Sequence, residues 1–240
     1  MAIDATQGPP VVEDDQMVER FTLVQRIQHM LMIVSMLVLL LTGVGLLFHD
    51  SWWAAWLIRL EGGMEARGWI HRASAVVLVV LSAWHACQVV FTRRGHGEFL
   101  RLMPALQDVR DFFQTMRFNA GKADRPPAFG KYSFTEKFQY NGVVVGTIIM
   151  IVTGLILWFE TVSMAVMPKW AFDLTLIVHG YEGVLAFIVL FLWHLYNVHL
   201  NPRVFPMDKV WLTGKTTMKE LRERHYLQYL EIHEKEHPAP

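Results

Sequence analysis

Four long runs of apolar residues divide the chain, and polar segments separate them. The runs cover roughly residues 27–48, 69–91, 139–160 and 175–200. The first carries no charge between Met30 and Phe48, so it lacks the polar face of a soluble amphipathic helix. About 20 helical residues, each rising about 1.5 Å, cross the hydrocarbon core of a bilayer. The pattern therefore predicts four transmembrane helices.

The basic residues distinguish two kinds of connecting segment. Nine Lys and Arg lie in the loop 92–138 and seven follow the fourth run, whereas 49–68 and 161–174 together hold only Arg59, Arg67 and Lys169. Short loops rich in Lys and Arg stay in the cytoplasm. We therefore expect both termini and the loop 92–138 to be cytoplasmic.

These patterns predict an all-α fold, an integral membrane four-helix bundle with polar extensions. We expect a cytoplasmic and disordered N-terminal arm over 1–22, a transmembrane domain over 23–205, and a cytoplasmic tail over 206–240. In the tail, Thr217 and Glu220 have the spacing of a capping box, which predicts a charged helix ending near Glu236.

The polar loop 92–138 also carries a regular pattern. Between Phe99 and Met116, apolar residues recur among arginines and aspartates, which is typical of a helix lying on the membrane surface.

Composition limits the chemistry that the chain can support. Hydrophobic residues make up 53% of the 240 residues, and the only cysteine, Cys87, lies in the second run. A single cysteine excludes an internal disulfide and any iron–sulfur cluster or thiolate zinc site held by this chain alone. Metal binding in this chain must therefore use histidine.

Histidine is unusually frequent inside the apolar runs. A lone intramembrane histidine is often only a hydrogen-bonded link between helices. Here six of the eleven histidines fall in the runs, which favours a cofactor instead. They are His29, His71, His85, His179, His194 and His199.

The spacing of these histidines predicts two levels of ligands. His71 and His85 are 14 residues apart, so they share a helix face about 21 Å apart along the axis. His179 and His194 are 15 apart, about 22 Å, with an offset of about 60° around the helix. Because the second and fourth runs have the same direction, each level offers one facing pair. We expect two b-type haems in the bundle core, each with two histidine ligands, and therefore one-electron transfer.

The inner level has more histidines than a single haem needs. By distance from the flanking charges, His85 matches His194, but His29 also lies toward the cytoplasm and can replace His85. A third haem between His29 and His199 would use all six histidines, although three haems would crowd a four-helix bundle.

A short repeat links the first and third runs. Leu41-Thr42-Gly43-Val44 near the end of the first resembles Val152-Thr153-Gly154-Leu155 near the end of the third. Small residues that allow close helix packing explain the repeat as well as an ancestral duplication does.

Over most of residues 20–215, the chain resembles the four-helix b-type cytochrome subunits of the formate dehydrogenase gamma and thiosulfate reductase type. The matching segments are Arg26-Ile27-Gln28-His29, Trp69-Ile70-His71-Arg72, Glu136-Lys137-Phe138-Gln139-Tyr140, His179 and His194-Leu195-Tyr196. The stretches 179–186, 201–207 and 212–214 look most like b-type cytochromes associated with multihaem c-type cytochromes. The resemblance implies that His71 and His179 bind an outer haem and that His29 and His194 bind an inner one. It leaves the choice between His29 and His85 open. Arg72, beside His71, can pair with a haem propionate or only mark the membrane boundary.

The resemblance also implies a quinone site, for menaquinone or ubiquinone, near the inner haem at the start of the third span. Tyr132 and Lys137 lie there, and His199 is expected at a similar depth. As individual residues, each of them can equally well be a boundary residue of the membrane.

Together these features predict a multi-pass protein of the bacterial inner membrane that passes electrons between a quinone pool and a periplasmic redox partner. We expect that partner to be a multihaem c-type cytochrome or an iron–sulfur subunit, in a hetero-oligomer whose catalytic site lies outside this chain. Membrane lipid is a further partner, and nucleic acid is not. The alternatives are a histidine-lined metal or proton transporter and a passive membrane anchor of a peripheral complex.

Overall fold

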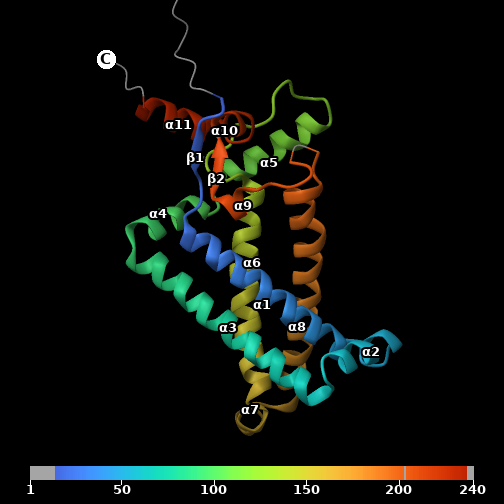
Figure 1. Ribbon diagram of the computed structural model, residues 1–240. Coiled ribbons are helices and arrows are strands. Elements are labelled where there is room, and N and C mark those ends of the chain that lie inside the picture. The colour runs from blue at the N-terminus through green and yellow to red at the C-terminus, as the bar shows by residue number, and fades with distance from the viewer. Residues whose placement is uncertain (1–13, 203, 237–240) are drawn as a thin grey trace, which may run out of the picture. The chain divides into compact units, whose positions relative to one another are not determined.

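The computed structural model describes residues 14–202 and 204–236, and most of them are helical (Figure 1). The first thirteen residues of the expected N-terminal arm and the last four of the expected tail lie outside the described residues. In chain order the elements are β1 (Met17–Glu19), α1 (Leu23–Leu47), α2 (Trp52–Leu60), α3 (Met64–Phe91), α4 (Arg93–Leu102), α5 (Leu106–Asn119), α6 (Phe134–Trp158), α7 (Glu160–Val166), α8 (Lys169–Ile188), η1 (Val189–His194), η2 (Tyr196–Leu200), α9 (Val210–Thr213), β2 (Lys215–Thr217), α10 (Met218–Arg224) and α11 (Tyr226–Glu236).

The described residues form two compact units. The first unit comprises residues 14–23, 97–141 and 209–236, and the second comprises 24–96, 142–202 and 204–208. The expected arm, most of the loop 92–138 and the tail therefore contribute to one unit.

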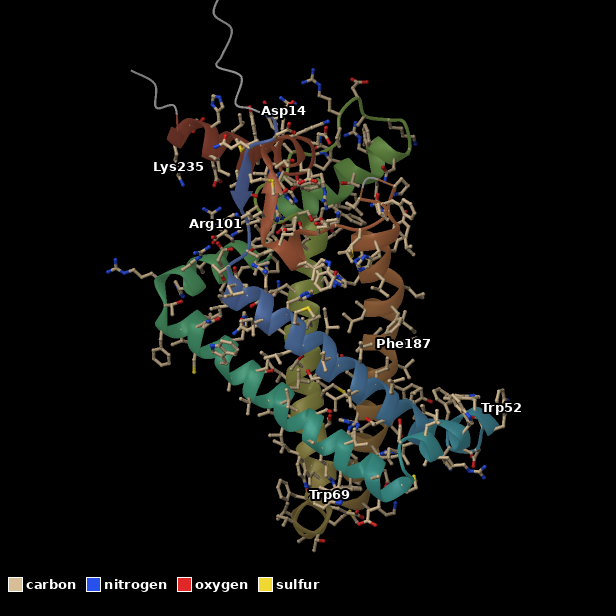
Figure 2. The ribbon with its side chains drawn as sticks, viewed as in Figure 1. Asp14, Trp52, Trp69, Arg101, Phe187 and Lys235 are labelled. Atoms are coloured by element: carbon tan, nitrogen blue, oxygen red, sulfur yellow. The ribbon has the colours of Figure 1, made fainter. Side chains whose placement is uncertain are left out.

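Four helical segments are long and apolar enough to cross a membrane, as the sequence predicts. They are Leu23–Leu47, Met64–Phe91, Phe134–Trp158 and Lys169–Leu200, and they appear blue, teal, yellow and orange in Figure 1. Most of their apolar side chains are exposed, such as Val80 and Ile148 at 62% and 58%. Figure 2 shows two more exposed residues of the second unit, Trp52 on α2 and Phe187 on α8. An apolar exterior of this kind is suited to lipid.

Helix α1 turns its polar and small residues inward. Gln28, Ser35 and Thr42 are buried and lie seven residues apart, two turns of helix each time, and Gly45 is buried one turn further on. The hydroxyls of Ser35 and Thr42 each donate to a carbonyl one turn back on the same helix. Burying small polar residues allows close helix packing in a membrane. The stripe therefore brings this face of α1 against its neighbours in the second unit.

The fourth span changes its helical form along its length. Residues 169–188 are α-helical, but Val189–His194 and Tyr196–Leu200 are π-helical. A π-helical turn contains more residues than an α-helical turn, so it rotates every following side chain around the axis. The 60° offset expected between His179 and His194 from regular α-helical geometry therefore does not apply.

The first unit contains an element that the hydrophobic pattern did not predict. Strand β1, from the segment expected to be a disordered arm, pairs antiparallel with β2, with Met17 opposite Thr217 and Glu19 opposite Lys215. The predicted capping box is confirmed, because Glu220 N–H donates to Thr217 Oγ1 at 3.1 Å and Thr217 N–H donates to Glu220 Oε2 at 3.0 Å.

The charged helix expected after Thr217 is interrupted. It forms two helices, α10 and α11, with His225 between them in a non-helical conformation. His225 Nδ1 donates to the carbonyl of Gly130 at 2.8 Å, which ties the junction to residues before the third span. This bond to a distant carbonyl explains why local helix propensity did not predict the break.

Arg20 joins three separate segments of the first unit. Its side chain is 6% exposed. It donates to Gln228 Oε1 at 3.1 Å, to the carbonyl of Lys131 at 2.7 Å and to Glu136 Oε1 at 3.2 Å. A buried guanidinium is stable only when several acceptors replace its water. These three bonds therefore connect the arm, the loop and the tail within one unit.

Helix α5 confirms that the polar loop contains a helix. Its apolar residues Leu106, Val109, Phe113 and Met116 are all more than half exposed, and Arg110 and Arg117 lie on the same side. The position of this face at the membrane surface stays a prediction.

Candidate functional site

The first candidate site joins α3 and α8. The ring centres of His71 and His179 lie 6.4 Å apart, and the ring planes cross at 67°. Both side chains are half-buried inside the second unit. The structure therefore brings together the two histidines that the sequence analysis expects at the outer level.

The second candidate site joins α1 and η1. The ring centres of His29 and His194 lie 6.3 Å apart, with the planes crossing at 68°, so this pair closely reproduces the geometry of the first. The depth comparison favoured His85 as the partner of His194, with His29 as the alternative. His85 lies on α3 and is half-buried. The ring geometry supports His29 as the partner of His194.

The spacing within each pair suits one metal ion between the rings. An imidazole nitrogen binds a first-row metal ion at about 2.0 Å and lies about 1.2 Å from its ring centre, so two rings on opposite sides of one ion have centres about 6.4 Å apart. Both observed separations match this distance. No group of three or more His, Cys, Asp or Glu side chains that could hold a metal ion occurs in 14–202 and 204–236. The donor sets are therefore facing pairs, as a haem iron with two axial ligands requires.

Threonines from neighbouring helices orient the first pair. Thr42 Oγ1 lies 2.8 Å from His71 Nδ1, and Thr153 Oγ1 lies 2.9 Å from His179 Nδ1. Each hydroxyl already donates its proton along its own helix at 2.7 Å, to the carbonyl of Val38 or Ile149. The threonine oxygen therefore accepts from the imidazole, and the proton sits on Nδ1. This tautomer leaves the Nε2 lone pair of each ring available to iron.

Each of these threonines is followed by a glycine that faces the same histidine. A Cβ on Gly43 would lie 3.7 Å from His71 Cε1, and a Cβ on Gly154 would lie 3.2 Å from His179 Cε1. The glycines therefore leave room beside the two rings. The Thr-Gly repeat noted in the sequence therefore has the same arrangement on α1 and on α6. The threonine accepts a hydrogen bond from the histidine, and the glycine leaves room for the ring.

Two of the three residues predicted for a quinone, Tyr132 and Lys137, are already bonded within the first unit. Tyr132 donates to Glu98 Oε2 at 2.6 Å, and Lys137 forms an ion pair with Asp108 at 2.9 Å. Burial, and then the hydrogen bond to Glu98, raises the pKa of Tyr132, so its phenol keeps its proton. His199 is half-buried on η2 in the second unit.

Arg72 lies in an aromatic environment, which favours the second of its two expected roles, that of a boundary residue. Its guanidinium carbon lies 5.9 Å from the centre of the Trp69 ring and 5.6 Å from that of Trp158. Such cation–π contacts stabilise a cation at an aromatic boundary. The aromatic rings therefore account for Arg72 without a propionate.

Sequence reasoning assigned no role to several polar residues beside the histidine pairs. Thr42 and Thr153 were visible only as part of a repeat. Arg67 and Gln28 are 6% and 7% exposed, which no local pattern indicated. Two features of the sequence could have pointed to these residues. Arg67 and Gln28 lie about one helical turn or less from a histidine, and Thr42 and Thr153 belong to the repeat.

Comparisons with known proteins identify the family of the chain. A family model described as prokaryotic cytochrome b561 matches residues 20–206, which include all four spans and both histidine pairs. A search of curated proteins finds no match to the chain. The chain therefore belongs to the prokaryotic cytochrome b561 family, and it is a multi-pass membrane protein of b-type haem electron transfer.

Proposed function

We propose that the chain holds two b-type haems, one between His71 and His179 and one between His29 and His194, and that it conducts electrons between the two faces of a membrane. The observation that carries the proposal is the pair of nearly identical ring separations, 6.4 and 6.3 Å. Haem held by two histidines in each pair would supply one-electron transfer.

The protein residues have separate tasks in this proposal. The four histidines hold the two groups, and Thr42 and Thr153 keep the Nε2 atoms of the first pair directed away from the threonines. The apolar exterior of the spans excludes water from both sites. His179 and His194 lie 15 residues apart on one span, so the two sites are about 20 Å apart along it. This separation covers much of the bilayer.

We further propose that a quinone, either menaquinone or ubiquinone, exchanges electrons with the site of His29 and His194 on the cytoplasmic side of an inner membrane. His199 supports this proposal best, because it lies on the same span as His194 and five residues beyond it. Tyr132 and Lys137 support it less, since both already have partners.

A periplasmic redox protein completes the proposed path, as either a multihaem c-type cytochrome or an iron–sulfur subunit. The expected outer connections α2 and α7 are short helices, and their exposed Trp52 and Val166 leave apolar surface for lipid or a partner. In this proposal the chain is the membrane subunit of a hetero-oligomer of the formate dehydrogenase gamma or thiosulfate reductase type.

Haem content per chain tests the proposal. Membranes with wild-type protein should contain two b-type haems per chain, by pyridine haemochrome assay and reduced-minus-oxidised spectra, and a quinol analogue should reduce both. His71→Ala and His29→Ala should each lose one haem, and His85→Ala should keep two. Fewer than two haems in the wild type would refute the dihaem proposal. Loss of one haem in His85→Ala but not in His29→Ala would show that His85, and not His29, is the partner of His194 at the inner site.

A further inference from the structure

Several buried polar atoms near the two histidine pairs have no hydrogen-bond partner among the described residues. Buried polar groups are almost always paired in native proteins, so each exception needs an explanation. The unpaired atoms include a guanidinium nitrogen of Arg26, the amide nitrogen of Gln28, both carboxylate oxygens of Glu61 and a guanidinium nitrogen of Arg67.

Arg67 is the most informative of these residues. It is 6% exposed, and its Nε is buried without an acceptor in 14–202 and 204–236. It lies four residues before His71 on α3, so it shares a helix face with His71 at about 6 Å along the axis. A buried guanidinium with an N–H group that lacks an acceptor carries a desolvation cost. Glu61 interacts electrostatically with Arg67, but neither of its carboxylate oxygens accepts a hydrogen bond from the described residues.

Arg72 provides the contrast on the same helix. It is adjacent to His71, but its guanidinium lies over the rings of Trp69 and Trp158. Arg72 therefore already has partners that stabilise its charge, whereas the buried Nε of Arg67 has no hydrogen-bond acceptor among the described residues.

The second pair repeats the arrangement. Arg26 lies three residues before His29 on α1, and its Nε is also buried without a partner. Gln28 is 7% exposed, and its amide nitrogen lacks an acceptor. Each site thus has an arginine one turn from a histidine, on the side of the helix N-terminus. The unpaired groups of Arg26, Gln28 and Arg67 are hydrogen-bond donors, which a ligand rich in acceptors would satisfy.

We propose that Arg67 binds a propionate carboxylate of the group held by His71 and His179, and that Arg26 and Gln28 bind a propionate of the group held by His29 and His194. The inference rests on the proposed function, because the propionates belong to the haems. A guanidinium donates two parallel charge-assisted hydrogen bonds to a carboxylate, and this pairing would satisfy the buried nitrogen. The positive charge of Arg67 would also raise the reduction potential of the outer site, by opposing the negative propionate.

Redox titration of the full-length protein in lipid nanodiscs tests the proposal. The variants are Arg67→Gln, Arg67→Lys and the matched control Arg72→Gln, and His71→Ala identifies which spectral component belongs to the outer site. Arg67→Gln should lower the potential of the outer component alone, by about tenfold in the reduction equilibrium, or about 59 mV for one electron. Arg67→Lys should recover most of the shift, and Arg72→Gln should give less than a third of it. Arg26→Gln should lower the inner component alone.

Glu61 gives a second signature of opposite sign. Removing its charge in Glu61→Gln should raise the potential of the outer component, because a negative charge near Arg67 disappears. A purely structural role for Arg67 does not produce opposite shifts in the two variants.

The outcomes separate this inference from the proposed function. Absence of two haems in the wild type would refute both and would be seen before any variant is compared. With two haems bound, unchanged potentials in Arg67→Gln, or an equal shift in Arg72→Gln, would overturn the inference alone. If Arg67→Gln lost the outer haem, Arg67→Lys would decide: a haem at nearly the wild-type potential supports the inference, and loss of haem there too overturns it.

Discussion

Thr42 and Thr153 show how one side chain can set the chemistry of a neighbouring one. Each donates its own proton to a helix carbonyl, so it can only accept from the histidine that it contacts. An accepting partner on the distal ring nitrogen increases the basicity of the metal-binding nitrogen. The two threonines therefore orient His71 and His179, and in the proposed function they would act on the haem through these histidines.

We predict that Thr42→Val and Thr153→Val each weaken haem retention at the outer site by about 10–100-fold and raise its reduction potential. Valine keeps the shape but removes the acceptor, so the imidazole becomes a weaker donor to ferric iron. Haem titration and redox titration measure the two effects. The control is Ser35→Ala, since the Ser35 hydroxyl bonds only to carbonyls of its own helix. Equal effects in the control would show that loss of any α1 hydroxyl is sufficient.

At the scale of the elements, the positions of the histidines depend on close contacts between helices. Gly180 on α8 faces Leu47 at the end of α1, and a Cβ there would come within 3.1 Å of the leucine side chain. Gly154 on α6 and Gly43 on α1 lie beside the outer histidines. Small residues at these crossings allow the helices to approach. These contacts between helices therefore determine the position of each imidazole ring.

We predict that Gly154→Ala impairs the outer site more than Gly43→Ala does. The new methyl group would lie 3.2 Å from His179 Cε1 in the first variant and 3.7 Å from His71 Cε1 in the second. Only the first distance is shorter than an ordinary carbon contact, so only His179 must move. The amplitude of the outer haem in difference spectra measures the loss. Equal loss in both variants would contradict this explanation of the asymmetry.

At the scale of the whole molecule, the first unit depends on polar contacts between distant segments. Arg20 bonds to the loop and the tail, and Glu98 accepts from both Lys131 and Tyr132. Burial alone would raise the pKa of Glu98, but these two hydrogen bonds lower it below its usual value. His225 is 6% exposed. Burial, together with the positive charge of Arg20, lowers its pKa to about 4, although Glu136 and the Gly130 carbonyl oppose the shift.

We predict that the first unit loses stability as the pH falls from about 6.5 to about 4. The folded form keeps His225 neutral over this range while the unfolded form binds a proton, so the free energy of unfolding decreases, by up to about 3 kcal/mol. Hydrogen exchange of the β1 and α10 amides at several pH values measures the effect. His225→Asn should flatten this dependence, whereas His96→Asn, which changes an exposed histidine, should leave it intact. An unchanged slope in His225→Asn would exclude His225 as the cause.

The sequence determined the parts of the protein that local rules encode. Uncharged runs of sufficient length predicted the four spans, the Thr217–Glu220 spacing predicted a helix start, and the histidine positions predicted two levels of ligands. The tertiary structure decided which groups meet. The π-helical turn at 189–194 alters the rotation that a regular helix would give His194, and the His194 ring lies beside that of His29. The contacts of Thr42 and Thr153 and the burial of Arg67 likewise depend on the rotation and axial offset of the helices. The period of one helix does not contain this information, because these quantities are set by contacts between helices.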